Sequence, residues 1–246
     1  MLKRLFVILL LAAPVPAMAA GINRNAPVVF NGCAEYVGFG PVPLADADAL
    51  VPRRFTVTDL GGVGGIVVRA ARCSSISVDG APGIPAMVSH VGVNIQSPDG
   101  TGDINNFTIV YATNHRALAE KLRKTGIPVV FNPMLVAEDP AAFPGDVYIS
   151  VFGRHLPAYS ITGTVNAPSF PPIPFLANWW AVGDRGVVKM ATDIPSIAFG
   201  IAALEFRTSS DSTLGRLIGG NSFSNFPFYD VRGEYVFGRM DVTTGR

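Results

Sequence analysis

The stretch AMVSHVGVNIQ, residues 86 to 96, shows most clearly how this chain folds. Its residues alternate with a period of two, which is the side-chain period of a β-strand. One face carries Met87, Ser89, Val91, Val93 and Ile95. The opposite face carries Ala86, Val88, His90, Gly92 and Asn94. The stretch therefore predicts a strand that places the polar side chains of His90 and Asn94 together, where core residues are expected.

Similar short runs of β-branched and aromatic residues, separated by Gly, Pro, Asn and Asp, extend along most of the chain. They predict strands at 63–73, 75–79, 86–96, 104–113, 127–136, 146–154, 158–165, 175–182, 186–192, 197–207 and 228–237. Leucine spacing and terminal signals predict helices at 115–125 and 211–219, with a shorter helical turn at 45–51. We therefore expect a mainly β (β-rich α+β) protein, with a single-domain, antiparallel, barrel-like sheet and two or three accessory helices.

The first twenty residues have the features of a secretory signal peptide. Lys3 and Arg4 precede an apolar run at 5–13, and a small-x-small pattern at 17–19 is suited to signal peptidase. The run is too short to span a membrane, which weighs against the alternative of an uncleaved anchor. We expect residues 1–20 to be a signal peptide, 21–35 an N-terminal arm and 36–246 one β domain. The mature protein would then be periplasmic or secreted.

Composition narrows the range of partners. Removal of the leader takes two of the 19 basic residues and leaves the 18 acidic ones, a net charge near −1. Such a chain has no electrostatic attraction for nucleic acid or anionic lipid. No further apolar stretch is long enough to span a membrane. We expect a small organic molecule as the partner, no nucleic acid and no membrane span after cleavage, while the oligomeric state stays open.

The two cysteines, Cys33 and Cys73, are expected to form a disulfide, because an exported chain folds in an oxidising compartment. The bridge would tie the N-terminal arm to an early strand. The alternative is a pair of buried free thiols that pack as small hydrophobic side chains.

Metal chemistry finds little support in the sequence. His90, His115 and His155 are widely spaced, and the chain has neither an HxH pair nor an HExxH motif. We expect no metal site and no cofactor.

Polar residues on two neighbouring strands predict a binding pocket. One face of the expected strand at 104–113 carries Asn105, Phe107, Ile109 and Tyr111. Beside the face with His90 and Asn94, Asn105 and Tyr111 would give polar anchors next to an apolar wall. In the alternative interpretation, these polar side chains only satisfy buried backbone groups or face solvent.

Lys189 is the candidate catalytic amine. It follows a strand with Trp179 and Trp180, which we expect to contact the substrate together with Asn94, Asn105 and Tyr111. Desolvation inside a barrel would lower the pKa of a lysine, as Schiff-base or general-base chemistry requires. His90 would then act as the general acid or base that transfers the proton. The alternative is a strand lysine that faces water.

Four segments together resemble the acetoacetate decarboxylase-like superfamily. They are the turn at 45–55 that ends in Leu50-Val51-Pro52-Arg53-Arg54-Phe55, Ile66-Val67-Val68-Arg69, Val91-Gly92-Val93-Asn94-Ile95, and Gly126-Ile127-Pro128. The resemblance covers residues 36 to 155, and 199–242 would supply the closing strands. It implies a closed, cone-like β-barrel with an interior cavity.

The chain departs from that superfamily at the catalytic position. Members that decarboxylate β-keto acids carry a reactive lysine in a strand near the middle of the chain, but the corresponding stretch at 144–154 contains no lysine. Two hypotheses follow. The first is an exported small-molecule-binding barrel, with lyase (decarboxylase-like) or isomerase activity on a keto-acid-like or apolar compound as an open question. The second is a non-catalytic binding or interaction domain.

Overall fold

The computed structural model describes residues 27–152, 158–224, 226 and 229–245. The predicted signal peptide, 1–20, lies outside these residues, as does His155. In chain order the elements are β1 (Val28–Pro43), α1 (Leu44–Leu50), β2 (Val63–Ser77), β3 (Ile84–Asn94), β4 (Ile104–Thr113), α2 (Arg116–Arg123), β5 (Val129–Phe131), β6 (Val136–Glu138), β7 (Gly145–Val151), β8 (Tyr159–Val165), β9 (Ile173–Gly183), β10 (Gly186–Thr208), α3 (Thr213–Ile218), β11 (Ser222–Ser224) and β12 (Tyr229–Gly245).

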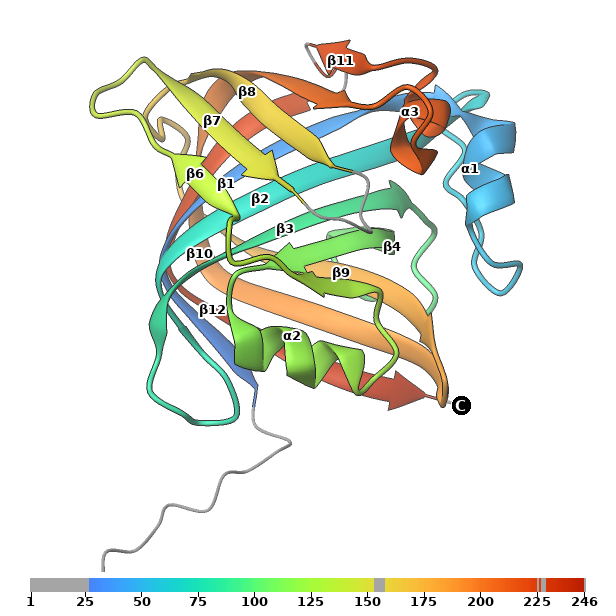
Figure 1. The fold of residues 1–246 in the computed structure, drawn as a ribbon, viewed down its shortest axis with the longest axis horizontal. Coiled ribbons are helices and arrows are strands. Elements are labelled where there is room, and N and C mark those ends of the chain that lie inside the picture. The colour runs from blue at the N-terminus through green and yellow to red at the C-terminus, as the bar shows by residue number, and fades with distance from the viewer. Residues whose placement is uncertain (1–26, 153–157, 225, 227–228, 246) are drawn as a thin grey trace, which may run out of the picture.

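Seven long strands close into a barrel. The order is β12-β1-β2-β3-β4-β9-β10, and pairing of β10 with β12 completes the ring (Figure 1). Neighbouring strands are antiparallel except at β4–β9 and β4–β5, which pair in parallel. The mainly β, barrel-like fold is therefore confirmed, with a mixed sheet.

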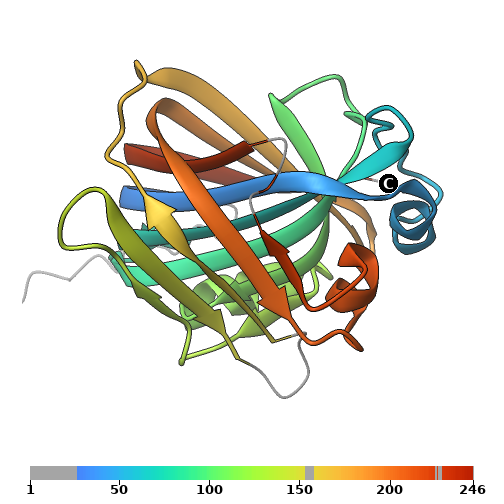
Figure 2. The same cartoon turned by 90° about the horizontal axis from the view of Figure 1, so that it is seen from above.

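A second layer covers part of the outer wall. β10 is 23 residues long, and its pairing with β9 is irregular between Ile194 and Ile197. Beyond this irregularity β10 runs on to pair with β8 and β11, so it belongs to both layers. β6, β7 and β8 complete the second layer, which lies across the barrel strands when the molecule is seen from above (Figure 2).

The core has two parts, one on each side of the barrel wall. The inner part includes Phe30, Tyr111 and Met190, and the α2 residues Leu118 and Leu122 close one end of the barrel. The outer part lies between the barrel wall and the second layer, where α1 and α3 also pack. β2 and β3 are rich in buried apolar residues on both faces because both faces are covered.

The expected helices are present in slightly shorter form. α2 begins after His115, whose Nδ1 accepts a hydrogen bond from the Leu118 N–H at 3.2 Å. α3 begins after Ser212, whose hydroxyl accepts from the Gly215 N–H, and ends at Gly219 in a left-handed conformation. Within the described residues, no helix is both long and apolar enough to cross a membrane.

Several strand boundaries differ from expectation. The segments expected as strands at 186–192 and 197–207 form one continuous β10, and β12 runs on to Gly245. β1 begins at Val28, so the described part of the range 21–35, expected to be an arm, is largely strand. The segments expected as strands at 63–73 and 75–79 form one continuous β2. The segment 127–136, expected as one strand, holds only the three residues of β5 and the start of β6. Pro128 and Pro133 interrupt this segment, and proline cannot donate a ladder hydrogen bond.

Candidate functional site

Two hollows lie among the described residues, on opposite sides of the barrel wall. The first, here called the outer groove, has a volume of about 890 Å³ and lies between the outer face of β1, β2 and β12 and the segment 135–139. The second, here called the barrel chamber, has a volume of about 490 Å³ and lies inside the barrel. The two hollows share no lining residue.

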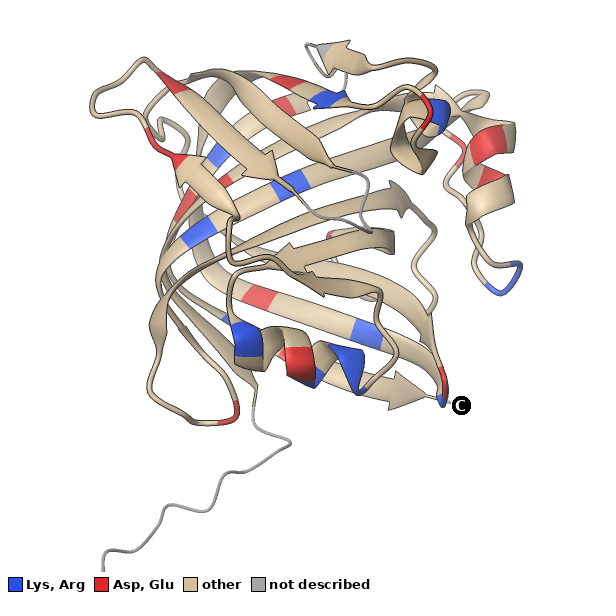
Figure 3. Cartoon of the chain, in the orientation of Figure 1, with Lys and Arg blue, Asp and Glu red and all other residues tan. Residues whose placement is uncertain are grey.

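Charged residues lie on α1, α2 and the loops and also on several of the long strands (Figure 3). A charged side chain in a buried strand must be paired or serve a ligand, because burial of an isolated charge is costly. Among the described Asp, Glu, Lys and Arg residues, Glu35, Arg69 and Arg232 are buried.

The disulfide belongs to the inner part of the core, and its two residues border the outer groove. Cys33 and Cys73 face each other in the β1–β2 pair, with an S–S distance of 2.07 Å and a Cα–Cα distance of 4.0 Å. Both residues line the groove. The expected disulfide is confirmed.

Arg232 is the main polar feature of the outer groove. Its side chain is only 5% exposed, and its Nη2 donates to Glu234. Its Nε and Nη1 have no hydrogen-bond partner among the described atoms. The guanidinium carbon lies over the ring of Phe143, 4.5 Å from the centroid, a favourable cation–π distance. Arg232 therefore presents a buried guanidinium to the groove, with the Tyr36 hydroxyl as its nearest further polar group.

A carboxylate and a phenol lie close to Arg232. Asp139 lines the groove and accepts hydrogen bonds from the Tyr36 hydroxyl and from Arg72. Burial, together with the hydrogen bond and negative charge of Asp139, raises the pKa of Tyr36 well above its usual range, and Arg232 only partly opposes this. Tyr36 is therefore a neutral phenol at physiological pH.

A buried ion pair lies in the wall of the barrel chamber. Arg69 Nε and Nη2 donate to the two carboxylate oxygens of Glu35, each at 2.7 Å. Burial alone would lower the pKa of Arg69, but the Glu35 carboxylate outweighs it and the net pKa is raised. The two charges neutralise each other in a bidentate geometry.

His90 lies deep in the barrel interior. Its ring packs against Tyr111, with centroids 3.9 Å apart, and edge-on against Trp179, at 4.5 Å. Burial and then the charge of Arg69 lower the pKa of His90 well below its usual range. Neither ring nitrogen has a partner among the described atoms. His90 is therefore neutral, and it does not line either hollow.

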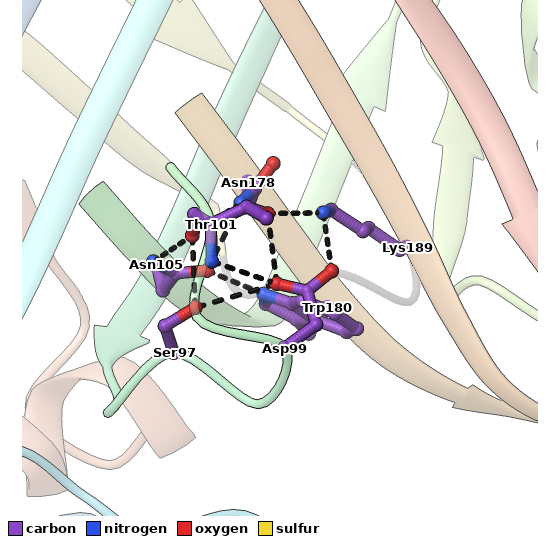
Figure 4. A network of polar contacts seen from close by, with 7 residues as sticks. All are labelled: Ser97, Asp99, Thr101, Asn105, Asn178, Trp180 and Lys189. Atoms are coloured by element: carbon purple, nitrogen blue, oxygen red, sulfur yellow. Dashed lines mark hydrogen bonds and ion pairs between the residues drawn. The ribbon is translucent and has the colours of Figure 1, made fainter. Parts of the chain in front are cut away.

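Lys189 lies on the outer face of the wall. Its Nζ donates to Asp99 at 2.6 Å and to Thr101 at 2.7 Å, and it lies 5.1 Å from the ring centroid of Trp180 (Figure 4). Burial would raise the pKa of Asp99, but the hydrogen bonds from Lys189 and Thr101 lower it to about 2. The ion pair fastens the β3–β4 loop to β10.

Further hydrogen bonds complete this external cluster. Asn105 Oδ1 accepts from Trp180 Nε1 at 2.9 Å and from Asn178 Nδ2 at 3.2 Å. Asn178 Nδ2 also donates to the Thr101 carbonyl at 2.9 Å. These contacts are internal to the fold (Figure 4), and none of these residues lines a hollow.

The residues predicted to form one site are thus divided between the two faces of the wall. His90, Asn94, Tyr111 and Trp179 lie on the inner face, whereas Lys189, Asn105 and Trp180 lie on the outer face. His90 and Asn94 share a face, as predicted. Of the seven residues, only Asn94 and Trp179 line a hollow, the barrel chamber.

The expected shared face of Asn105 and Tyr111 was wrong because of a bulge in β4. Val91 pairs with Val110, but the next residue, Gly92, pairs with Thr108. Ile109 is therefore an extra residue, which shifts the alternation by one. Two-residue periodicity cannot reveal such an insertion.

Sequence reasoning missed the ion pair Glu35–Arg69 and the groove residue Arg232. A usable signal was present, because Arg69 interrupts the apolar run Ile66-Val67-Val68 and Ala70-Ala71. A charged residue inside such a run is a candidate for a buried functional group. Across the described residues, no group of three or more His, Cys, Asp or Glu side chains could hold a metal ion.

The closed barrel with its outer layer is the acetoacetate decarboxylase-like fold. Among solved structures, the enduracididine biosynthesis enzyme MppR with HEPES buffer bound is similar, with a TM-score of 0.59 and 13% identity over 94% of this chain and 90% of that one. MppR complexed with pyruvate has a TM-score of 0.59 and 15% identity, over 95% of this chain and 97% of that one.

An acetoacetate decarboxylase-like enzyme from Sphingomonas wittichii RW1 has a TM-score of 0.57 and 14% identity, over 96% of this chain and 100% of that one. Comparison of the sequence with protein families and with curated proteins found no match. Identities this low establish a shared fold and leave the reaction open.

Proposed function

We propose that the protein binds a small organic acid of the keto-acid class in the outer groove. The observation that carries this proposal is Arg232, a buried guanidinium with Nε and Nη1 unpartnered among the described atoms. A buried donor without a partner costs free energy, which a ligand acceptor would recover. A carboxylate fits best, because its oxygens match the planar donor geometry of arginine.

The rest of the groove is suited to the apolar end of such an organic acid. Met87, Leu135 and Val136 supply an apolar wall, and the volume of about 890 Å³ is in the range of small-molecule sites. MppR has been solved with pyruvate, a 2-keto acid. That complex supports keto acids as the first compounds to test with this chain.

The reaction that we propose is a cofactor-independent lyase or isomerase reaction, with Asp139 beside the bound acid as the group that exchanges a proton. None of the described lysines, Lys121, Lys124 and Lys189, lines the groove, so this chemistry would proceed without a Schiff base. The catalytic roles predicted for Lys189 and His90 gain no support from their positions on opposite faces of the wall.

Non-catalytic binding is the second candidate. It is favoured by the state of Asp139, whose carboxylate already accepts hydrogen bonds from Tyr36 and Arg72. Two donors already occupy the oxygens of this carboxylate, so fewer lone pairs are open to a substrate proton. Turnover measurements decide between the two candidates.

Export is part of the proposal. The leader at 1–20 has the pattern of a signal peptide. The Cys33–Cys73 disulfide supports the same conclusion, because disulfides persist mainly in oxidising compartments. Intact-mass analysis of the protein from its native host should find an N-terminus near Ala20 or Gly21.

The binding proposal is tested by calorimetric titration of the purified protein with 2- and 3-keto acids, each compared with its neutral amide. We expect the acids to bind and the amides to bind much more weakly. Arg232→Met should lower the affinity for the acid by about 10- to 100-fold, the range for a hydrogen-bonded charge pair. Carbon dioxide release and proton NMR of the same mixtures report lyase or isomerase turnover.

Arg239→Met is the matched control. Arg239 lies on the same strand, β12, but its side chain is 51% exposed and pairs with Asp241 away from the groove. This variant should bind like the unmodified protein. Equal affinities of the unmodified protein and a folded Arg232→Met variant would refute the assignment of the groove.

A further inference from the structure

We infer that the barrel chamber is a second ligand site, which takes a neutral, largely aromatic or apolar molecule with one hydrogen-bond acceptor. This site is independent of the organic-acid site proposed above. Ala34 lines the outer groove, whereas its neighbour Glu35 lines the chamber. Likewise, Arg232 lines the outer groove and its neighbour Val231 lines the chamber. Adjacent residues of a strand point to opposite faces, so the barrel wall separates the two ligands.

The chamber has the wall of an aromatic-binding site. Five of its lining residues are aromatic: Phe39, Phe175, Trp179, Phe199 and Tyr229. They come from β1, β9, β10 and β12, so aromatic rings approach the chamber from several sides of the barrel. Its volume of about 490 Å³ is sufficient for a compound of two or three fused rings.

The charges of the chamber disfavour an anion. Arg69 is the only cationic residue that lines the chamber among the described residues, and both of its bonded nitrogens are engaged by Glu35. The remaining charged lining residue is Asp103, whose Oδ2 accepts from the Leu176 N–H at 2.7 Å. An anion would therefore lose its hydration without gaining a free cation. A neutral ligand avoids this cost.

Asn106 supplies the polar anchor. It lines the chamber and is fully buried, and its Nδ2 has no partner among the described atoms. The orientation of the Asn106 amide follows from its contact with Asn94. Asn94 Nδ2 donates to the Asn105 backbone carbonyl at 2.9 Å, and the same nitrogen lies 3.4 Å from Asn106 Oδ1. The Asn105 carbonyl can only accept, so the Asn94 atom beside it must be the nitrogen. The Asn106 atom that faces this nitrogen is then the oxygen, and Asn106 Nδ2 is left to donate elsewhere. A ligand carbonyl or ether oxygen would satisfy it.

The two tryptophans provide an internal reporter. Trp179 lines the chamber, whereas Trp180 lies on the outer face, and the chain has only these two. In a Trp180→Phe variant, all tryptophan emission comes from the chamber. The probe is prodan, a neutral dimethylaminonaphthalene with a propionyl carbonyl. The matched anion is the same ring with a sulfonate in place of the propionyl group.

We expect prodan to bind the Trp180→Phe protein with sensitised emission from Trp179, and the sulfonate to bind at least about tenfold more weakly. Asn106→Leu should lower prodan affinity by about 5- to 10-fold, the value of one hydrogen bond, and shift the probe emission to shorter wavelength. Asn166→Leu, at an exposed amide outside both hollows, is the matched control.

A second variant tests the chamber if Asn106→Leu does not fold. Val231→Phe narrows the chamber from a half-buried position and should reduce prodan binding while circular dichroism stays unchanged. A saturating concentration of keto acid should not displace prodan, because the two ligands occupy different sites. If one of the two ligands does not bind, the test of the other site is still valid. Absence of sensitised emission, equal affinity for the sulfonate, or displacement of prodan by the keto acid overturns the inference.

Discussion

Trp179 and Trp180 are neighbours in β9, yet their rings lie on opposite sides of the barrel wall. Trp179 packs edge-on against His90 in the interior, at 4.5 Å between centroids, and Trp180 lies beneath Lys189 Nζ on the outside, at 5.1 Å. A side chain or ligand that contacts the Trp179 ring is therefore separated by the sheet from one that contacts the Trp180 ring. This division also separates Lys189 from His90.

The amine role of Lys189 can be tested directly. Lys189 is ion-paired with Asp99 and lies outside both hollows, so we expect pyruvate or acetoacetate with borohydride to leave it unlabelled. Peptide mass spectrometry after trapping gives the answer. A covalent adduct on Lys189 that is lost in Lys189→Met would instead establish the catalytic role predicted from the sequence.

Removal of the disulfide should destabilise the protein. The bridge closes a segment of 40 residues, which corresponds to about 4 kcal/mol in the chain-entropy description of the unfolded state. We expect the variant Cys33→Ala/Cys73→Ala to lose stability of that order in urea unfolding. Unmodified protein kept in reductant should approach the same value, and a difference below about 1 kcal/mol would contradict the prediction.

The buried ion pair should respond asymmetrically to substitution. Glu35→Gln leaves the Arg69 charge buried without its partner, and we expect a loss of about 3 to 5 kcal/mol in the free energy of unfolding. Glu35→Leu/Arg69→Met removes both charges and should recover much of that loss. Arg239→Ala, which breaks an exposed pair with Asp241, should cost less than about 1 kcal/mol. A double variant less stable than Glu35→Gln would argue against this account.

Asp230 should make stability depend on pH. Burial raises its pKa from 3.8 to about 6, against backbone hydrogen bonds from Leu204 and Phe226 that lower it. A raised pKa favours the protonated form in the folded state, so this contribution is complete below pH 3.8 and is lost as pH rises through 6.

Asp230→Asn removes that titration. Because Asp230 is only partly buried as a residue, solvent screening reduces the expected gain to no more than about 1 kcal/mol at pH 7.5, with little difference at pH 4. Urea unfolding of both proteins at the two pH values measures the effect. A variant that is less stable than the unmodified protein at pH 7.5 would show that the Asp230 charge is favourable.

Local patterns in the sequence determined much of the fold. Alternation in β3 placed His90 and Asn94 on one face, and the expected helices appear at α2 and α3, because these features depend on neighbouring residues. The Cys33–Cys73 pairing also followed, since the sequence has only two cysteines and a leader with the pattern of a signal peptide.

The site was decided by the tertiary structure. Whether a strand residue faces the barrel chamber or the outer groove depends on bulges such as Ile109 and on the layer that covers each face, and neither has a local sequence signal. The partners of buried polar groups come from other segments: Arg69 pairs with Glu35 on the neighbouring strand, and Asp139, at the end of β6, accepts from Tyr36. Sequence periodicity thus gave the alternation of side chains, but only barrel closure decided which side of the wall each one occupies.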